Sequence, residues 1–470
     1  MRSPLTARRL ESAAPLMLLA WVLLNYGWTL GFGFMNDDYI WIDGARWPAD
    51  GAWLRTAFVP PAWSGSFLRP LVQLSFFVNY LASGISPVGY RACNVLLQVA
   101  NTYLVWRLAH ALAIDSVPAL WAALLFAVHP SHAEVVTWIS GRTELIATAC
   151  YLTALLQHRA RRTGWAAVWF ALALLAKESA ASLVFIVVAI DLLAPRGARW
   201  RPGPWLLYAV VFSAYLALRH FATQHFAQGY ITWSMVLSRP GESIVLVATR
   251  FAQSFRSLLV PLPLPGVSAM GIVIALAGAA AWAVRDAVTR RVVGLASIWM
   301  PLALLPFVGF FTFQQRYVYL ASIGWTMLLV CGGSGLAGRL ITQRWRQTAV
   351  AAGAAVWILA CVASLQLHNR ELRRNGAMSD QVVNALVAAV PRPAQRTLFV
   401  VAGLGPLRGS SLEWSHDPVL LFGLPEAARL RFNDQTVDVR FAEVPSSTAS
   451  DAGRPVVHLQ WNPRMGAFTR

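Results

Sequence analysis

The sequence is 470 residues long, and 57% of the residues are hydrophobic while only 13% carry a charge. A soluble globular protein is about one quarter charged, so this composition excludes that class and indicates a membrane protein. The net charge of +18 comes from 39 basic and 21 acidic residues. In a soluble protein this excess would suggest a nucleic-acid partner, but in a membrane protein we expect no nucleic acid.

Lysine is almost absent, because Lys177 is the single lysine among the 39 basic residues and the other 38 are arginines. A coding bias toward arginine explains most of the surface arginines and leaves the one lysine as an exception. The four cysteines have no paired spacing, so they predict neither disulfides nor a metal site.

Eleven apolar segments are candidate membrane helices, for which about 20 residues suffice. They cover residues 14–34, 92–112, 116–129, 143–157, 164–176, 179–194, 204–220, 267–284, 293–312, 318–337 and 347–366. The first could be mistaken for a cleaved signal peptide, but its apolar run is long and no A-x-A site ends it. We therefore expect an all-α polytopic membrane protein with additional interfacial helices in its outer loops.

The membrane topology depends on whether segment 67–83 crosses the membrane. This segment contains Arg69, Pro70, Gln73 and Asn79, which suit a helix lying along the membrane surface better than a span. If it does not cross the membrane, the basic clusters at the ends of the second, fourth, sixth, eighth and tenth predicted spans lie on the cytoplasmic side with the N-terminus. The positive-inside rule requires this arrangement. These clusters are Arg107; Arg159, Arg161 and Arg162; Arg196, Arg199 and Arg201; Arg285, Arg290 and Arg291; and Arg339, Arg344 and Arg346.

The chain changes character after His368. From Arg396 it shows short strand-like and turn-like stretches, namely TLFVVAGLG, ARLRFNDQTVDVRFAEV and PVVHLQW. We predict a membrane domain over residues 1–367 and a small soluble α/β domain over residues 368–470. With a cytoplasmic N-terminus in a bacterial inner membrane, this domain and the polar loops that carry the candidate site lie on the periplasmic side.

Two acidic residues, Asp37 and Asp38, directly follow the first predicted span. Partial burial raises the pKa of a carboxylate, and one placed here could accept the proton of an acceptor hydroxyl. The plainer alternative is that acidic residues mark a helix end in water. Adjacent side chains point in different directions, so we expect one aspartate to face a cavity and the other to be structural.

The loop HPSHAEVVTWISGRTE places His129, His132 and Glu134 within six residues, and Arg142 and Glu144 follow where the next helix starts. Imidazole and carboxylate groups suit zinc or manganese, so the first three could be metal ligands. A cradle for sugar and phosphate is an equal alternative. Ordinary hydrogen-bonding histidines are the more common case, and no H-E-x-x-H pattern is present.

Lys177 and Glu178 interrupt an apolar run, and ionisable residues at membrane depth are usually paired or functional. They could form a local ion pair at a tight outer turn, or Lys177 could bind a phosphate as a point charge while Glu178 orients it. Arg316, in QQRYVY, is a second candidate phosphate ligand because its guanidinium can donate to two oxygens at once.

Segment 240–261 is the second expected interfacial helix. Arg250, Gln253 and Arg256 follow each other at intervals of three, which places them on one helix face. Such a helix could border the entrance for a lipid carrier, or it could simply present a solvated face.

Five motifs in order carry a family resemblance. They are MNDDYIW, FLRPLVQLSFFVNYLASGISPVGYRACNVLLQVANTYLVWRL, FAVHPSHAEVVTWISGRTELIATACYL, LAKESAASLVFIVVAIDLL and QQRYVYLASIGW. Together they resemble the transmembrane, tetratricopeptide-repeat O-mannosyltransferases and their bacterial relatives, within the GT-C superfamily of membrane glycosyltransferases. The likeness covers roughly residues 14–337. The chain departs from the family in its C-terminal part, where no tetratricopeptide repeats occur.

The resemblance implies an enzyme that takes a sugar, mannose or another hexose, from a polyprenyl-phosphate carrier and passes it with inversion to a protein or glycan acceptor. It implies acidic catalytic residues at Asp37 and Asp38 and donor-binding groups at His129, His132, Glu134, Arg142, Glu144, Lys177 and Glu178. No cofactor is implied beyond the lipid-linked donor, with a divalent metal possible but not expected. Two alternatives come from other classes: a transporter or flippase of a lipid-linked or anionic solute, and a membrane anchor for the C-terminal domain.

Overall fold

The protein is described by a computed structural model that covers residues 4–46, 57–58, 67–194, 202–224, 233–309, 313–404, 423–441 and 453–469. The helices are α1 (Pro4–Tyr26), α2 (Asp38–Arg46), α4 (Pro70–Ser83), α5 (Pro87–Ala111), α6 (Ser116–Ala127), α7 (Ala133–Val136), α8 (Arg142–Arg159), α9 (Thr163–Ala176), α10 (Leu183–Leu192), α11 (Pro202–Thr223), α12 (Trp233–Ser238), α13 (Pro240–Leu258), α14 (Gly266–Ala283), α15 (Ala287–Leu304), α16 (Ala321–Leu340), α17 (Gln343–Ala389) and α18 (Leu424–Phe432). Short 3₁₀ turns connect them: η1 (Gly27–Thr29), η2 (Pro130–His132), η3 (Ile139–Gly141), η4 (Glu178–Ser182), η5 (Leu305–Phe307) and η6 (Gln315–Val318). The strands are β1 (Leu398–Ala402), β2 (Asp438–Phe441), β3 (Val456–Asn462) and β4 (Ala467–Thr469).

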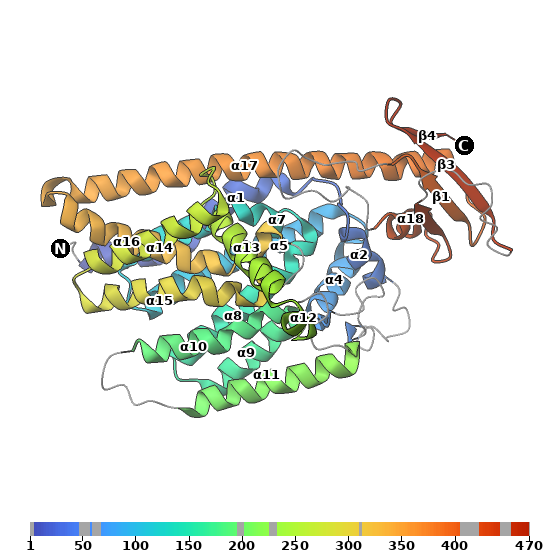
Figure 1. Cartoon of the computed structure of the whole chain (residues 1–470). Helices are drawn as coiled ribbons and strands as arrows, with labels where there is room; N and C mark the ends of the chain where they lie inside the picture. The colour runs from blue at the N-terminus through green and yellow to red at the C-terminus, as the bar shows by residue number, and fades with distance from the viewer. Residues whose placement is uncertain are drawn as a thin grey trace.

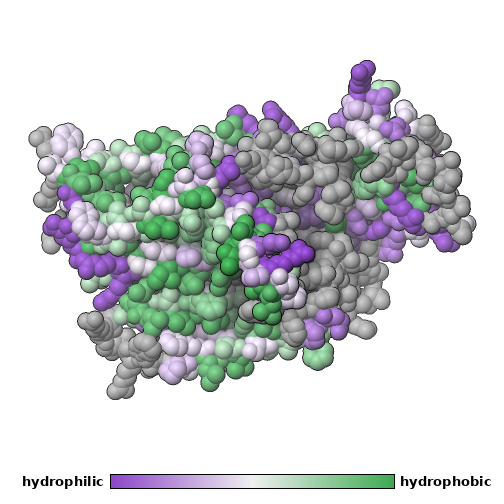
Figure 2. Space-filling model, viewed as in Figure 1, coloured by the Kyte–Doolittle hydropathy of each residue, from purple (hydrophilic) through white to green (hydrophobic). Residues whose placement is uncertain are grey.

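The long helices run in roughly one direction, and the strands lie beyond the far end of α17 (Figure 1). The N-terminus lies at the opposite end of this helical body. Figure 2 shows hydrophobic residues across the helical body and hydrophilic residues at the N-terminal end and around the strands. This distribution is the one expected of a helix bundle that crosses a membrane with a polar unit on one side.

Each of the eleven predicted spans coincides with a helix, but the helices differ in length and polarity. Among the described residues, six helices are long and apolar enough to cross a membrane by length and composition, and a seventh span is possible if a bent pair counts as one. The bent pair joins 116–127 to 130–136 at an angle of 52°. Helices α9 and α10 have only 14 and 10 residues, so the count of eleven spans stays a prediction. Residues 310–312 of one predicted span and the Arg196, Arg199 and Arg201 cluster lie outside the described residues.

Helix α5 is long enough to span but carries a buried row of amide side chains. Asn94 donates to the carbonyl of Val136 at 3.3 Å, Gln98 donates to that of Ala127 at 3.2 Å, and Asn101 donates to that of Leu145 at 3.0 Å. The acceptors lie in and around the bent α6–α7 segment and in α8. Away from water, a broken helix must find partners for its free carbonyls, and the amides of α5 supply them.

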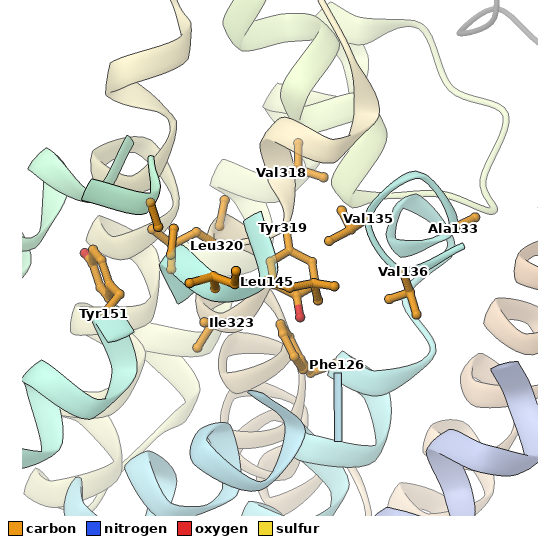
Figure 3. Packing of buried hydrophobic residues seen from close by; sticks show 14 of the residues in the cluster. Phe126, Ala133, Val135, Val136, Leu145, Tyr151, Val318, Tyr319, Leu320 and Ile323 are labelled. Atoms are coloured by element: carbon orange, nitrogen blue, oxygen red, sulfur yellow. The ribbon is translucent and has the colours of Figure 1, made fainter. Parts of the chain in front are cut away.

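Tyr319, which follows η6, packs into the same region. Its ring centroid lies 5.2 Å from that of Phe126, and Figure 3 shows Val135 and Leu145 beside it. The Tyr319 hydroxyl donates to Gln98 and accepts from Asn101. The segment before Tyr319 is therefore anchored to the bend between α6 and α8.

The two segments expected to form interfacial helices are separate helices, and their position at the membrane surface stays a prediction. Helix α4 is 14 residues long and packs against α2 and α5. In α13 the Arg250 guanidinium donates to Gln253 at 2.7 Å, which confirms that these residues share a face. Helix α13 packs against α14 and η6.

The C-terminal part shows two features that the sequence did not indicate. Helix α17 continues for 47 residues through His368, so no break in the chain marks the predicted boundary at residue 368. The stretch ARLRF, expected to be a strand, forms the end of α18, because Pro425 at the helix start and Asn433 in a left-handed C-cap favour a helix. The sheet is mixed, with order β2-β1-β3-β4, parallel β2–β1 and β1–β3 pairs and an antiparallel β3–β4 pair.

Candidate active site

All the candidate residues lie at helix ends or in the short segments between helices. Asp37 precedes α2 and Asp38 starts it; His129 and His132 flank or lie in η2; Glu134 lies in α7; Arg142 and Glu144 lie in the first turn of α8; Lys177 and Glu178 join α9 to η4; and Arg316 lies in η6. The 3₁₀ turns η4 and η6 both contact α15. The tertiary structure therefore gathers charges from distant parts of the sequence.

Asp38 is fully buried, and both of its carboxylate oxygens accept backbone hydrogen bonds. Oδ2 accepts from the Met35 N–H at 3.0 Å, and Oδ1 accepts from the Ser140 N–H at 2.9 Å. Burial, with help from the charge of Asp37, raises the pKa of Asp38 to about 7. Asp38 thus joins the first outer loop to η3, and we assign it a structural role.

Asp37 has a different environment. Its Oδ1 atom is shielded from solvent and accepts no hydrogen bond from any described residue. Burial raises the pKa of Asp37, while the nearby Arg316 guanidinium opposes the shift, as do the side chains of Ser140 and Trp138. A carboxylate with a raised pKa and a free oxygen is suited to accept a proton.

Arg316 is held by its backbone and leaves its side chain available. Its N–H donates to Glu134 Oε2 at 2.9 Å, and its guanidinium lies 5.2 Å from the centroid of the Trp138 ring. Within the described residues the guanidinium makes no hydrogen bond. Glu134 is buried, with 2% of its surface exposed. Its hydrogen bond to the backbone of Arg316 positions η6, and this places the charge of Arg316 where it acts on Asp37.

Lys177 is 3% exposed and forms an ion pair with Glu144. Its ammonium also lies 5.3 Å and 5.4 Å from the ring centroids of Phe307 and Tyr317, which stack on each other. Burial lowers the pKa of Lys177 to about 8, although the charge of Glu144 opposes this shift. The charge of Arg316 also acts on Lys177, so the two cations share one electrostatic environment.

Glu178 pairs with Arg69, a residue that the sequence reasoning did not place in the site. The Arg69 guanidinium donates to Glu178 Oε1 at 2.7 Å and to Oε2 at 3.3 Å. Although burial acts in the opposite direction, Arg69 holds the pKa of Glu178 at about 2. The sequence shows an arginine directly before Pro70, at the start of α4. That arginine could have indicated a partner for Glu178, but segment 67–83 was used only to decide the topology.

Arg142 is surrounded by hydrogen-bond partners from three helices. It is fully buried, and it donates to Asn94 Oδ1 at 2.9 Å, to Asn79 Oδ1 at 2.7 Å and to the Tyr90 carbonyl at 2.8 Å. Its guanidinium also lies 4.4 Å from the Phe76 ring centroid. These hydrogen bonds join α4, α5 and α8 through Arg142, and the expected contact of Arg142 with the donor stays a prediction.

The two histidines are buried in the helix bend. His129 uses both ring nitrogens, with Ser131 Oγ at 2.8 Å and the Leu258 carbonyl at 3.1 Å. His132 Nε2 bonds to Ser322 Oγ at 3.0 Å. Among the described residues, no group of three or more His, Cys, Asp or Glu side chains is arranged to hold a metal ion. The geometry favours the ordinary hydrogen-bonding alternative for both histidines.

The charged groups of this region therefore fall into two kinds. Asp38, Glu134, Glu144 and Glu178 are each held by a hydrogen bond or ion pair. Within the described residues, Asp37 retains a free carboxylate oxygen and Arg316 a guanidinium without a hydrogen bond. A carboxylate with one unpaired oxygen beside a guanidinium without a hydrogen bond can receive a proton and a developing negative charge in the same place.

Comparisons with known proteins show what the chain is similar to. No protein-family model matches the chain. Protein O-mannosyl-transferase Tmtc1 of Drosophila melanogaster is 38% identical over 215 residues, which cover 42% of this chain and 24% of that protein. Tmtc2 of the same organism is 36% identical over 198 residues, 37% of this chain and 21% of that protein. TMTC3 of Mus musculus is 29% identical over 199 residues, which cover 38% of this chain and 22% of that protein.

The solved structures that match include an oligosaccharyltransferase of Archaeoglobus fulgidus. In its complex with zinc and sulfate the TM-score is 0.47 at 12% identity, covering 90% of this chain and 61% of that one. For the structure of the same protein with a tethered acceptor peptide, the TM-score is 0.44 at 13% identity. That match covers 89% of this chain and 64% of the other. The matches to the curated relatives span less than a quarter of their length. Over the matched part, the chain is similar to protein O-mannosyl-transferases, which confirms the family resemblance carried by the motifs.

Proposed function

We propose that this protein is a membrane glycosyltransferase that transfers a hexose, with mannose as the first choice, from a polyprenyl-phosphate carrier to a hydroxyl group of a protein. The reaction takes place on the extracytoplasmic face and inverts the anomeric carbon. The similarity to protein O-mannosyl-transferases supports the reaction class. The observation that carries the assignment of residues is the free Oδ1 of Asp37 beside Arg316, in a region where the other candidate acids are held.

In the proposed reaction, Asp37 accepts the proton of the acceptor hydroxyl as its oxygen attacks the anomeric carbon of the sugar. The bond between this carbon and the phosphate oxygen breaks, and its electron pair leaves with the lipid phosphate. Arg316 and Lys177 then stabilise the added negative charge. Fixed cations in a poorly hydrated site are effective here, and loss of one such donor typically costs ~10²–10³ in rate.

The remaining charged residues position these groups. Glu134 holds the backbone of Arg316, and Glu144 fixes the ammonium of Lys177. Glu178 fixes Arg69 at the start of α4. These contacts keep the cations in place before the substrate arrives, so little reorganisation is needed during the reaction.

The test is sugar transfer by the purified full chain in detergent. Polyprenyl-phosphate mannose, glucose and N-acetylglucosamine are offered separately with a serine- and threonine-containing peptide, and the product is detected by mass spectrometry. We expect one donor to give a mass shift of one sugar on a hydroxyl residue. The anomeric configuration of the product, read by NMR, reports on inversion.

The matched pair of variants is Asp37→Asn and Glu242→Gln. Glu242 is an exposed carboxylate whose partner is the exposed Arg239, so its loss should leave activity unchanged. Asp37→Asn should remove transfer while the protein stays folded. Full transfer by Asp37→Asn would contradict the assigned base. Uptake of a donor into proteoliposomes without transfer would favour a transporter instead.

A further inference from the structure

An open cavity of about 600 Å³ lies along α17. Its lining residues are Trp28, Gln366, Arg370, Arg373, Arg374 and Ala377. None of them belongs to the charged cluster around Asp37. The cavity therefore requires an explanation of its own.

The spacing of these residues places them on a single face of α17. Positions 366, 370, 373, 374 and 377 follow the three- and four-residue intervals of neighbouring side chains on a helix. Arg370, Arg373 and Arg374 are exposed. Within the described part of the chain, none of the three guanidiniums makes a hydrogen bond or an ion pair. Three like charges so close together repel one another, and an anion in the cavity would relieve this repulsion.

The cavity begins where the apolar surface of α17 ends. Leu359 and Leu367 are 67% and 57% exposed, as expected of lipid-facing side chains, and the arginines start three residues after Leu367. Trp28 is 41% exposed and donates from its indole nitrogen to Gln366 at 2.8 Å. Tryptophan is enriched at the boundary between lipid and water, so this is the depth at which phospholipid headgroups lie.

The predicted topology makes this cluster unusual. The end of α17 lies on the side opposite the N-terminus, where basic residues near the membrane are disfavoured by the positive-inside rule. Three arginines within five residues go against that rule. A ligand that needs them on the outer side gives a physical reason for their presence.

We propose that this cavity binds the phosphate of an anionic phospholipid of the outer leaflet. The planar guanidiniums of Arg370, Arg373 and Arg374 would donate to the phosphate oxygens. Trp28 would pack against the glycerol and the upper acyl chain, and its indole is already held by Gln366. This proposal does not depend on the glycosyltransferase activity.

The bound lipid would also contact the loop that leads to Asp37. Trp28 lies 5.1 Å from Phe32 between ring centroids. The carbonyls of Phe32 and Gly33 accept hydrogen bonds from buried Arg91 of α5. A lipid held at Trp28 would therefore stabilise the start of the first outer loop.

The experiment measures lipid retention by native mass spectrometry. The full chain is released from nanodiscs made of equimolar phosphatidylglycerol and phosphatidylcholine, and the ratio of the two lipids that stay bound is recorded. A basic side chain near an anionic surface contributes enough that loss of three should reduce the phosphatidylglycerol ratio by at least about tenfold. The test variant is Arg370→Gln/Arg373→Gln/Arg374→Gln.

A matched variant removes the same charge from the opposite end of the bundle, at the exposed residues Arg161, Arg162 and Arg285. Each is replaced by glutamine, and this triple variant should keep the phosphatidylglycerol ratio of the wild type. An unchanged ratio in the α17 variant, or an equal loss in both variants, would overturn the site. Melting temperatures of the variants verify that all are folded, and Arg→Lys at the same three positions should retain part of the preference.

Inorganic phosphate serves as the second probe. In detergent without anionic lipid, phosphate alone should raise the melting temperature of the wild type less than short-chain phosphatidylglycerol does, because it lacks the apolar part that Trp28 would contact. If phosphate stabilises the wild type and phosphatidylglycerol does not, the ligand is a free phosphate and the lipid assignment is wrong.

Discussion

Asp38 Oδ1 accepts a hydrogen bond from the backbone N–H of Ser140 at 2.9 Å. The two residues are 102 positions apart in the sequence. This bond joins the first outer loop to the turn before α8. It also occupies one of two adjacent carboxylates and leaves the neighbouring Asp37 to face Arg316.

The first prediction separates the two aspartates. Asp37→Asn should reduce kcat by roughly 10²–10⁴, the range typical of general acid–base groups, with little change in melting temperature. Asp38→Ala should instead destabilise the protein by about 1–3 kcal/mol, because it leaves the Met35 and Ser140 N–H groups unpaired. Steady-state kinetics and thermal unfolding in detergent measure both effects. The opposite pattern would exchange the roles of the two residues.

The second prediction concerns the acid limb of the pH–rate profile. Burial raises the pKa of Asp37, while Arg316 holds it down by favouring the charged form. A base must be deprotonated, so transfer should fall as the pH drops through this raised pKa, above the ordinary value of about 4. Arg316→Gln should move the acid limb to higher pH, and Arg316→Lys should move it less. An acid limb that stays in place in Arg316→Gln would show that another group titrates.

The third prediction concerns the basic limb. The pKa of Lys177 is lowered to about 8 by burial, and the charge of Glu144 opposes this. If the ammonium charge stabilises the leaving phosphate, transfer should fall as the pH rises through about 8. Glu144→Gln removes the opposing charge, so the pKa of Lys177 should fall further and the basic limb should move to lower pH. Glu242→Gln, which removes an exposed carboxylate paired with Arg239, should leave this limb unchanged.

The fourth prediction concerns the stability provided by Arg69 and Glu178. Removing one partner of a buried ion pair costs about 3–5 kcal/mol, because the other charge stays buried and uncompensated. Glu178→Leu should therefore lower the melting temperature more than the double variant Arg69→Met/Glu178→Leu. The folded-state pKa of Glu178, about 2, lies below its ordinary value of 4.5, so the stabilisation is present above pH 4.5 and is lost as the pH falls toward 2. Additive effects in a double-mutant cycle would contradict the coupling.

The fifth prediction concerns the contact between α18 and the first outer loop. A Cβ atom at Gly423 would lie 2.1 Å from the Asn36 carbonyl oxygen, and Arg429 of α18 forms an ion pair with Asp43 of α2 at 3.3 Å. Gly423→Ala should displace α18 and increase hydrogen exchange in residues 33–46. Gly453→Ala is the matched control, since both glycines have positive φ but Gly453 has nothing within 4 Å of its added Cβ. Equal exchange in the two variants would show that the contact does not order the loop.

Much of the helical architecture could be predicted locally. Apolar runs of sufficient length form helices whatever their partners, because the backbone must satisfy its own hydrogen bonds in lipid, and each of the eleven predicted spans coincides with a helix. The shared helix face in segment 240–261 could be predicted from the spacing of Arg250 and Gln253. The ARLRF stretch was assigned wrongly to a strand, since its alternating pattern suits a short strand as well as a helix end, and the caps of α18 decided between them.

The sequence by itself determined that this is a helical membrane protein with polar motifs at its helix ends, because composition and apolar run length act locally. It also identified the charged residues of those motifs as candidates for the site. Only the tertiary structure decided which of them are free. Arg142 looked as available as Arg316, and Asp38 looked equivalent to Asp37, yet buried carbonyls, amides and N–H groups from other helices bind Arg142 and Asp38. The physical reason is that hydrogen-bond partners come from distant segments, 102 residues away for Asp38 and Ser140, and no local pattern records whether a buried charge has already found its partner.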